Sequence, residues 1–354
     1  MFTSWGLTWR RPPVAARWTP CGHPAASVFL SFGRRELRAD CRGAQGRSGE
    51  AELTGLSLTF RDYVAGGTVI VTGANTGIGK QTALELARRA RRRPGTSAGR
   101  PSITVSSARH LDLASLKSIR EFPAARVLTC LPEEERVDVM VNTAAVMRCP
   151  HWTTEDGFEM QFGVNYLGHF LLTHLLLDKL RASAPARIIN LSSLAHVAGH
   201  VDLEDLNWQR RKYDTKAAYC QSKLALVLFT KELSRRLPGT GVTVNALHPG
   251  VARTELGHWC PRVCGLSALW LLAGPIFWLL VKSPQLAAQP STYLAVAEEL
   301  EGVSGKYFDG FKEKAPAPEA EDEELACRLW AESARLVGLD LSHGSPVRGQ
   351  SLSR

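Results

Sequence analysis

The order of apolar and polar positions along the chain predicts strands that alternate with helices. Short β-branched or apolar runs at residues 68–72, 137–142, 187–191 and 242–247 are typical of buried strands. Apolar positions recur with helical period at residues 80–93, 114–122, 158–180 and 217–237. This alternation predicts an α/β fold, a Rossmann-type doubly wound parallel sheet in a single domain, with ligands at the carboxyl ends of its strands.

The pattern is interrupted after the first helix. A second strand with its crossover helix needs at least about a dozen residues beyond the strands themselves. Between residues 93 and 112 the chain offers only a Pro/Gly/Ser/Arg stretch at 94–101 and one short strand candidate at 102–106. We therefore expect the second strand–helix unit to be truncated, and the residue that would end the second strand and read the ribose 2′ position is not identifiable.

An apolar segment at residues 266–281 contains Trp270, Trp278 and a central Gly-Pro pair. At sixteen residues it is shorter than the ~20 that a membrane-spanning helix needs, and the proline would break such a helix. We interpret it first as a lid over an apolar substrate site, second as a membrane-surface contact and third as core. A final helix is expected at residues 321–337, after a Pro-rich link at 315–318.

Composition separates the folded domain from its extensions. The chain has 354 residues, is 44% hydrophobic and carries a net charge of +9, and its first 49 residues contain only two acids, Glu36 and Asp40. We assign residues 1–61 to a basic N-terminal segment, 62–312 to the domain, 313–340 to a C-terminal link and helix, and 341–354 to a disordered tail.

The basic N-terminal segment has the composition of a mitochondrial transit segment, but four prolines between residues 12 and 24 would break the amphipathic helix that import needs. A disordered basic tail explains the composition equally well. We expect no nucleic-acid partner, because no recognition motif accompanies the charge. The eight cysteines lack metal-ligand spacing, so we expect no metal site and read them as reduced thiols in an intracellular protein.

A glycine-rich turn joins the first predicted strand to the first predicted helix. It contains Gly73, Asn75, Thr76, Gly77, Ile78 and Gly79. Glycines allow the backbone to approach a pyrophosphate closely, and the helix N-terminus supplies N–H groups and a positive dipole end. Because the flanking strand and helix provide the required context, this segment predicts a dinucleotide site.

Tyr219 and Lys223 lie four residues apart in the helix predicted at 217–237, and so share one face. An ammonium group near a phenol favours the phenolate, which helps a tyrosine with an ordinary pKa near ~10 to exchange protons near neutrality. Taken alone, such a pair occurs by chance in many helices. Asn142, Ser193 and Gly250 fall at the carboxyl ends of predicted strands, where ligands bind.

The ordered set of these features resembles the short-chain dehydrogenase/reductase family. The set comprises the glycine turn after Thr72, then Asp112, Asn142, Asn165, Ser193, the Tyr219/Lys223 pair and Pro249-Gly250. Finer strings at residues 72–80, 147–152 and 191–196 resemble its retinol dehydrogenase branch. The resemblance covers roughly residues 62–339.

In that family, Tyr219 would be the proton donor and acceptor, Lys223 would lower its pKa and bind the nicotinamide ribose, and Ser193 would hydrogen-bond the substrate oxygen. Asn165 would hold a water that relays protons. The resemblance implies NADP as cofactor. The implied cofactor-binding residues are Gly73, Asn75, Thr76, Gly77, Ile78, Gly79, Asp112, Asn142, Tyr219, Lys223, Pro249, Gly250 and Thr254.

The expected activity is interconversion of retinal and retinol, with reduction favoured, or of similar apolar aldehydes. We also expect mitochondrial inner-membrane association, or alternatively the endoplasmic reticulum membrane, with a peripheral membrane contact and a homodimer as further expectations. The chain departs from the family pattern in the shortened 93–112 region, in Ala145 where the family has glycine, and in its basic N-terminus. A catalytically inactive or unstable isoform is therefore the alternative hypothesis.

Overall fold

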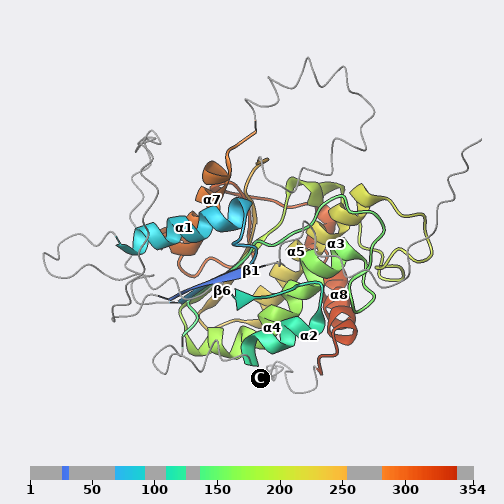
Figure 1. Cartoon of the computed structure of the whole chain (residues 1–354), viewed down its shortest axis with the longest axis horizontal. Helices are drawn as coiled ribbons and strands as arrows, with labels where there is room; N and C mark the ends of the chain where they lie inside the picture. The colour runs from blue at the N-terminus through green and yellow to red at the C-terminus, as the bar shows by residue number, and fades with distance from the viewer. Residues whose placement is uncertain (1–25, 32–67, 92–108, 125–135, 253–280, 341–354) are drawn as a thin grey trace, which may run out of the picture.

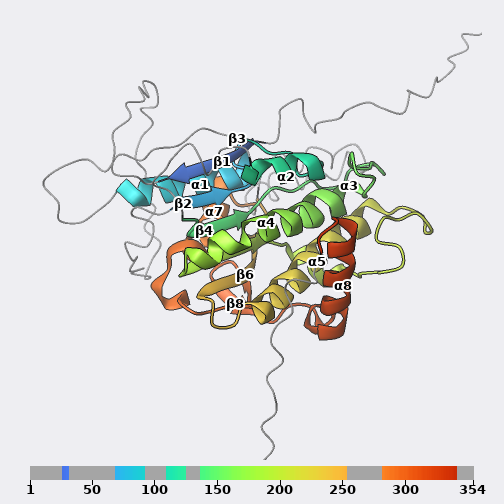
Figure 2. The same ribbon diagram turned by 90° about the horizontal axis from the view of Figure 1, so that it is seen from below.

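The computed structural model describes residues 26–31, 68–91, 109–124, 136–252 and 281–340. Its centre is an eight-stranded sheet of order β3-β1-β2-β4-β5-β6-β7-β8. The strands are β1 (Ala26–Ser31), β2 (Thr68–Val71), β3 (Arg109–His110), β4 (Val139–Asn142), β5 (Ala186–Leu191), β6 (Val242–His248), β7 (Tyr307–Asp309) and β8 (Lys312–Lys314). The order runs across the molecule in Figure 2, from β3 at the top to β8 at the bottom.

Helices cover both faces of the sheet. They are α1 (Gly77–Arg91), α2 (Leu116–Ala124), α3 (Met160–Phe162), α4 (Gly168–Ala182), α5 (Thr215–Arg236), α7 (Pro284–Val296) and α8 (Glu323–Leu336). In Figure 1, α1 and α7 lie together on one side of the sheet, and α2, α4, α5 and α8 lie on the other. The structure therefore confirms the predicted Rossmann-type α/β domain.

The central strands β2, β4, β5, β6 and β7 run parallel to one another, whereas β1 and β8 at the two ends of this set run antiparallel to it. All residues of β2, β4 and β5 are buried, as expected for strands covered on both faces. Side chains alternate between two cores: Val69 and Val139 pack toward α1 and α7, whereas Ile70 and Met140 pack toward α4 and α5.

The place beside β2 is filled by β1, a strand from the basic N-terminal segment. β1 pairs antiparallel with β2, from Val28 opposite Val71 to Ser31 opposite Thr68, and antiparallel with β3 at Ala26 and Ser27. Our boundary at residue 61 therefore placed one strand of the sheet outside the domain. An unpaired edge of β2 would leave a row of N–H and C=O groups without partners, and a segment remote in sequence satisfies them here.

The remaining predictions match the structure to different degrees. The helix predicted at 114–122 begins two residues later, and that predicted at 321–337 is α8. The elements α7, β7 and β8 were not predicted from the sequence. The strand candidate at 102–106, nearly all of the apolar segment at 266–281 and the tail at 341–354 lie outside the described residues.

An aromatic cluster fixes α8 against α4 and α5. The Trp330 ring lies 5.2 Å from Phe170, 5.8 Å from Phe229 and 4.7 Å from His174, measured between ring centroids. The Tyr166 hydroxyl also lies 2.7 Å from that of Ser333. The C-terminal helix is thus an integral part of the core.

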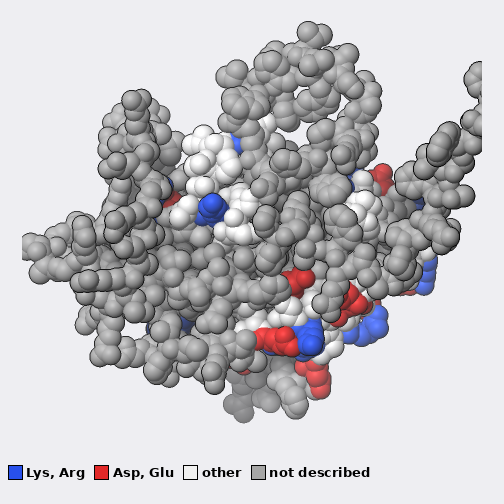
Figure 3. All heavy atoms as spheres, in the orientation of Figure 1, with Lys and Arg blue, Asp and Glu red and all other residues white. Residues whose placement is uncertain are grey.

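The described surface mixes charges of both signs. Figure 3 shows acidic and basic side chains side by side at the lower edge of that face. Many of the described charges are paired, for example Lys306 with Glu313 at 2.9 Å and Lys231 with Glu321 at 2.5 Å. Within the described ranges, no helix is both long and apolar enough to cross a membrane.

Candidate active site

The glycine turn between β2 and α1 is closed tightly against the loop that follows β4. Gly73 has a φ of +67°, and a Cβ on it would lie 2.8 Å from the Cα of Ala144. Gly77 also has a positive φ, of 54°, at the first residue of α1. A Cβ on Gly79 would lie 2.4 Å from the carbonyl oxygen of Gly73. Only glycine fits at these positions, because side chains disfavour positive φ or would collide with the backbone.

Thr72 ties this turn to the start of α4. The backbone N–H groups of Thr143 and Ala144 donate to Thr72 Oγ1 at 2.9 and 3.1 Å, and His169 Nε2 lies 2.9 Å from the same oxygen. Burial lowers the pKa of His169 to about 4, so the imidazole is neutral. Its Nδ1 faces the carbonyl oxygen of Asn165 at 2.9 Å and must be the donor. Nε2 therefore accepts the hydroxyl proton of Thr72.

Ala145 is compatible with its loop. Among the described residues that are not glycine, positive φ values occur only at Arg148 and Trp208. Ala145 is not one of them, so its backbone conformation does not require glycine. The Asn142 amide group donates to Asn190 Oδ1 at 2.8 Å and to Thr173 Oγ1 at 3.3 Å. Asn142 thus joins β4 to β5, while its own side-chain oxygen is buried without a hydrogen-bond partner among the described residues.

Asn165 lies in a π-helical turn, Gly163–Leu167, between α3 and α4. The sequence predicts one continuous helix at 158–180, but the structure interrupts it here, and π-helical turns occur frequently at functional sites. Asn165 Nδ2 donates to Val146 O and to Ser222 Oγ, each at 2.9 Å, and Asn165 Oδ1 accepts Val146 N–H at 2.8 Å. Both amide protons are in use, so the side chain holds the loop after β4 against α5.

Ser193, Tyr219 and Lys223 come together at the carboxyl end of β5. Tyr219 and Lys223 lie on α5, and Ser193 lies two residues beyond the end of β5. The Ser193 hydroxyl accepts the N–H of Ala195 at 3.2 Å, and it lies near enough to the Tyr219 phenol to act on its pKa. Lys223 Nζ lies 5.7 Å from the centroid of the Tyr219 ring and donates to Leu191 O at 2.9 Å. The structure therefore brings these three predicted residues together at one strand end.

The protonation properties of this group follow from burial. Burial raises the pKa of Tyr219 to about 12, although the nearby Ser193 hydroxyl favours the phenolate. Burial likewise lowers the pKa of Lys223 to about 7. In this structure the lysine does not offset the burial of the tyrosine. Lowering of the tyrosine pKa by Lys223 remains a prediction that requires the protonated ammonium.

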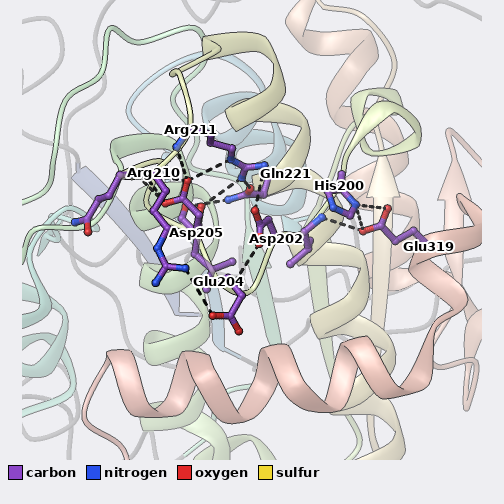
Figure 4. Close-up of polar contacts among 11 residues, drawn as sticks. His200, Asp202, Glu204, Asp205, Arg210, Arg211, Gln221 and Glu319 are labelled. Carbon is purple, nitrogen blue, oxygen red and sulfur yellow. Dashed lines mark hydrogen bonds and ion pairs between the residues drawn. The ribbon is translucent and has the colours of Figure 1, made fainter.

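The chain between Ser193 and Tyr219 is folded onto α5 by a polar cluster, shown in Figure 4. Arg211 Nη2 donates to Gln221 Oε1 at 2.7 Å, and the guanidinium carbon lies 3.8 Å from the centroid of the Trp208 ring. Gln221 Nε2 in turn donates to Leu206 O at 3.0 Å. Asp205 accepts backbone N–H groups from residues 209 to 211. Because Gln221 lies between Tyr219 and Lys223 in sequence, the cluster holds the loop against the part of α5 that carries these two residues.

The other predicted cofactor residues are placed as follows. The Asp112 carboxylate accepts the N–H of Ala114 at 2.9 Å ahead of α2. Pro249 and Gly250 follow β6, and a Cβ on Gly250 would lie 2.8 Å from Lys282 Nζ. Asn75 is exposed at the glycine turn, with Thr76 and Ile78 half-buried beside it. Thr254 lies outside the described residues.

The residues fit a bound nicotinamide dinucleotide at the edge of the sheet. The glycine turn has no side chains at its closest points, and the first amides of α1 have no partner within the helix. Gly73, Gly77 and Gly79 would hold the pyrophosphate, while Tyr219 and Lys223 would face the nicotinamide half. The adenosine half would lie on the side of the sheet beyond β2. There the fit is incomplete, because the neighbouring strand β1 runs antiparallel to β2.

Comparison with known proteins places the chain in a family. A family model described as short chain dehydrogenase matches residues 105–260. Relatives with much higher coverage extend the match beyond these residues. The chain therefore belongs to this family of oxidoreductases, which use NAD or NADP. Retinol dehydrogenase 13 of Mus musculus is 68% identical over 327 residues, covering 85% of this chain and 96% of that protein. Its Homo sapiens counterpart is 68% identical over 326 residues, with the same coverage.

More distant relatives agree. Retinol dehydrogenase 14 of Mus musculus is 45% identical over 301 residues, covering 77% of this chain and 86% of that protein. A crystal structure of an uncharacterised protein from Mycobacterium paratuberculosis matches with a TM-score of 0.56 and 32% identity, covering 75% of this chain and 91% of that one. The resemblance to the retinol dehydrogenase branch, and within it to retinol dehydrogenase 13, is confirmed.

The contacts that Thr72, His169 and Gln221 make around the site were not predicted from the sequence. Thr72 and His169 are 97 positions apart in the sequence, and no local pattern links them. His169 could have been noticed because it follows Asn165 by one helical turn. Gln221 lies inside the Tyr219/Lys223 motif, but on a different face of the helix.

Proposed function

We propose that this protein is an NADP-dependent oxidoreductase that interconverts retinal and retinol, or similar apolar aldehydes and alcohols, with reduction favoured. The observation that carries the proposal is the grouping of Ser193, Tyr219 and Lys223 at the carboxyl end of β5, on the same edge of the sheet as the glycine turn after β2. The names of the 68% identical relatives supply the substrate class.

In the proposed reaction, the chain's residues act on the substrate oxygen. The cofactor supplies the hydride when bound. The Ser193 hydroxyl hydrogen-bonds the carbonyl oxygen and Tyr219 protonates it, since the phenol remains protonated at neutral pH. Lys223, with a pKa near 7, exchanges protons readily and would restore the phenol proton or stabilise the phenolate in its charged form.

An apolar substrate suits the side chains around this group. Leu194 and Val197 lie in the short turn that follows Ser193 and are 52% and 57% exposed, and Val251 after Gly250 is 59% exposed. Exposed large apolar side chains on the segments that follow β5 and β6, at the ends where ligands bind, favour a hydrophobic ligand. The apolar segment at 266–281, interpreted as a lid, is consistent with this proposal but lies outside the described residues.

We further propose that the protein is located in mitochondria, associated with the inner membrane, and that it contacts the membrane peripherally and forms a homodimer. The acid-poor N-terminus supports import. Because β1 begins at Ala26, any cleavage compatible with the complete sheet lies before that residue. The endoplasmic reticulum membrane is the alternative location, and fractionation of cells that express the full chain would distinguish the two.

The experiment that tests this function combines binding and turnover. NADPH is titrated against the purified full chain with protein fluorescence and melting temperature as readouts, and reduction of retinal, medium-chain aldehydes and a polar sugar aldehyde is then compared. A hundredfold excess of NADPH over its Kd adds about 2.7 kcal/mol to the free energy of unfolding, so tight binding raises the melting temperature. Absence of NADPH binding would instead support an inactive isoform, and better turnover of polar carbonyls would contradict the apolar site.

A further inference from the structure

His196 connects the segment that carries Ser193 to the C-terminal link. Its side chain is buried, with 1% of its surface exposed, in the short 3₁₀ turn Leu194–Ala198 that follows Ser193. The ring nitrogen Nδ1 lies 2.7 Å from the carbonyl oxygen of Ser193. The other ring nitrogen, Nε2, lies 3.1 Å from the backbone N–H of Ala317. One imidazole ring therefore spans two segments 121 positions apart in the sequence.

These partners allow a single protonation state. A carbonyl oxygen only accepts, so Nδ1 must carry a proton, and a backbone N–H only donates, so Nε2 must be bare. The neutral Nδ1–H tautomer satisfies both bonds, and burial lowers the pKa of His196 in the same sense. The ring also packs against Tyr307 of β7, with 4.5 Å between centroids. His196 thus has a fixed position and orientation.

A second connection fastens the same two segments nearby. Glu319 accepts the backbone N–H of Val201 at 2.9 Å and lies 3.1 Å from His200 Nδ1, a pair visible at the right of Figure 4. On the opposite side, a Cβ on Gly199 would lie 2.6 Å from the carbonyl oxygen of Cys220, the residue after Tyr219. The segment 193–201 is therefore held between α5 and the C-terminal link.

We propose that His196 is a positioning residue for Ser193, and that through it the C-terminal link fixes the serine hydroxyl relative to Tyr219. This inference rests on the proposed function, because it assumes that Ser193 contacts the substrate oxygen. The backbone N–H of His196 also donates to Ser193 O, at 3.1 Å, so the imidazole doubles a bond that the turn already makes. Loss of the imidazole bonds would loosen the serine without unfolding the turn.

Three variants test the proposal on the full chain. His196→Phe keeps a ring against Tyr307 but loses both bonds, and His196→Gln keeps one donor and one acceptor. Ala317→Pro removes only the N–H that Nε2 accepts, and its φ of −58° already suits proline. His200→Phe is the matched control, because the His200 side chain is 73% exposed and Glu319 keeps its bond to Val201 without it.

We expect His196→Phe to lower kcat for aldehyde reduction about tenfold to a hundredfold, as small misplacements of reacting groups do, with little change in KM and in the NADPH Kd. Ala317→Pro should lower kcat less, His196→Gln should recover most of it, and His200→Phe should match wild type. A His196→Phe protein that melts lower yet keeps the wild-type kcat when folded would show a structural role only, and would overturn the proposal.

A second measurement separates this proposal from the proposed function. The ¹⁵N spectrum of histidine-labelled protein at neutral pH should show a neutral Nδ1–H histidine whose signals change in Ala317→Pro and vanish in His196→Phe. If the wild-type protein reduces no aldehyde, the proposed function fails. The spectrum then tests by itself whether His196 hydrogen-bonds both Ser193 and Ala317. An Nε2–H tautomer for His196 would overturn the proposal whatever the activity.

Discussion

The two halves of the sheet are built differently. On the catalytic side, β4, β5 and β6 pair in parallel over four to six residues, and hydrogen bonds such as Lys223 Nζ to Leu191 O join α5 to the strand ends. On the adenosine side, β3 has two residues and β1 runs antiparallel to β2. The comparison teaches that one half of this domain is specified by consecutive strand–helix units, whereas the other is completed by a segment from far away.

Removal of β1 should give the largest effect. A chain lacking residues 1–31 would leave the edge of β2 unpaired and β3 without its neighbour, a loss of several kcal/mol from the roughly 5–15 kcal/mol that stabilises a domain. We expect a strongly lowered melting temperature and fast hydrogen exchange at β2. A chain lacking residues 1–20 retains β1 and serves as the control. Equal melting of the two truncations would show that β1 is not part of the sheet.

Tyr219→Phe tests the catalytic half alone. The substitution keeps the ring but removes the hydroxyl near Ser193 that is proposed to donate the proton, so kcat should fall by about a thousandfold or more while the NADPH Kd stays the same. Tyr166→Phe is the control, since its hydroxyl contacts Ser333 of α8 and its loss should cost about 1 kcal/mol of stability without affecting turnover. Substantial turnover by Tyr219→Phe would disprove the assignment of the proton donor.

Lys223→Met tests the burial of the ammonium. The pKa of Lys223 is near 7 in the folded protein and near 10.5 when the group is free. Between these two pH values the unfolded chain binds more protons than the folded one. Lys223 therefore makes the free energy of unfolding rise with pH in that window. The slope is at most about 1.4 kcal/mol per pH unit. We expect the variant to lose this rise between pH 7 and 9, measured by denaturant unfolding. Identical slopes in both proteins would show that Lys223 stays charged in the fold.

Cofactor choice should give the smallest effect, and it reports on the adenosine side. Arg89 on α1 is already paired with Glu85 at 2.9 Å, and Arg92, Arg93 and Arg100 lie outside the described residues. Exposed arginines would attract the 2′-phosphate only weakly and would be screened by salt. We expect NADPH to bind more tightly than NADH by a ratio that shrinks as salt increases. A large ratio that salt leaves unchanged would indicate a fixed 2′-phosphate site.

The sequence predicted the catalytic half well, because its signals are local. The buried strands, the glycine turn and the i, i+4 pair of Tyr219 and Lys223 each occupy a few consecutive positions, and their order alone indicated the family. The prediction failed where partners are remote. Residues 26–31 form an apolar run, but the prolines and arginines around it do not indicate a strand. The run forms a strand because it pairs with the edge of β2, which is remote in sequence.

The sequence by itself therefore determined the fold class and the family, and it predicted which residues carry the chemistry. The tertiary structure decided what surrounds them: the antiparallel strand beside β2, the π-helical turn at Asn165 and the tautomers of His169 and His196. The physical reason is that a strand or helix is set by neighbouring side chains, whereas a hydrogen bond that closes a sheet edge or fixes an imidazole depends on groups that only folding brings together.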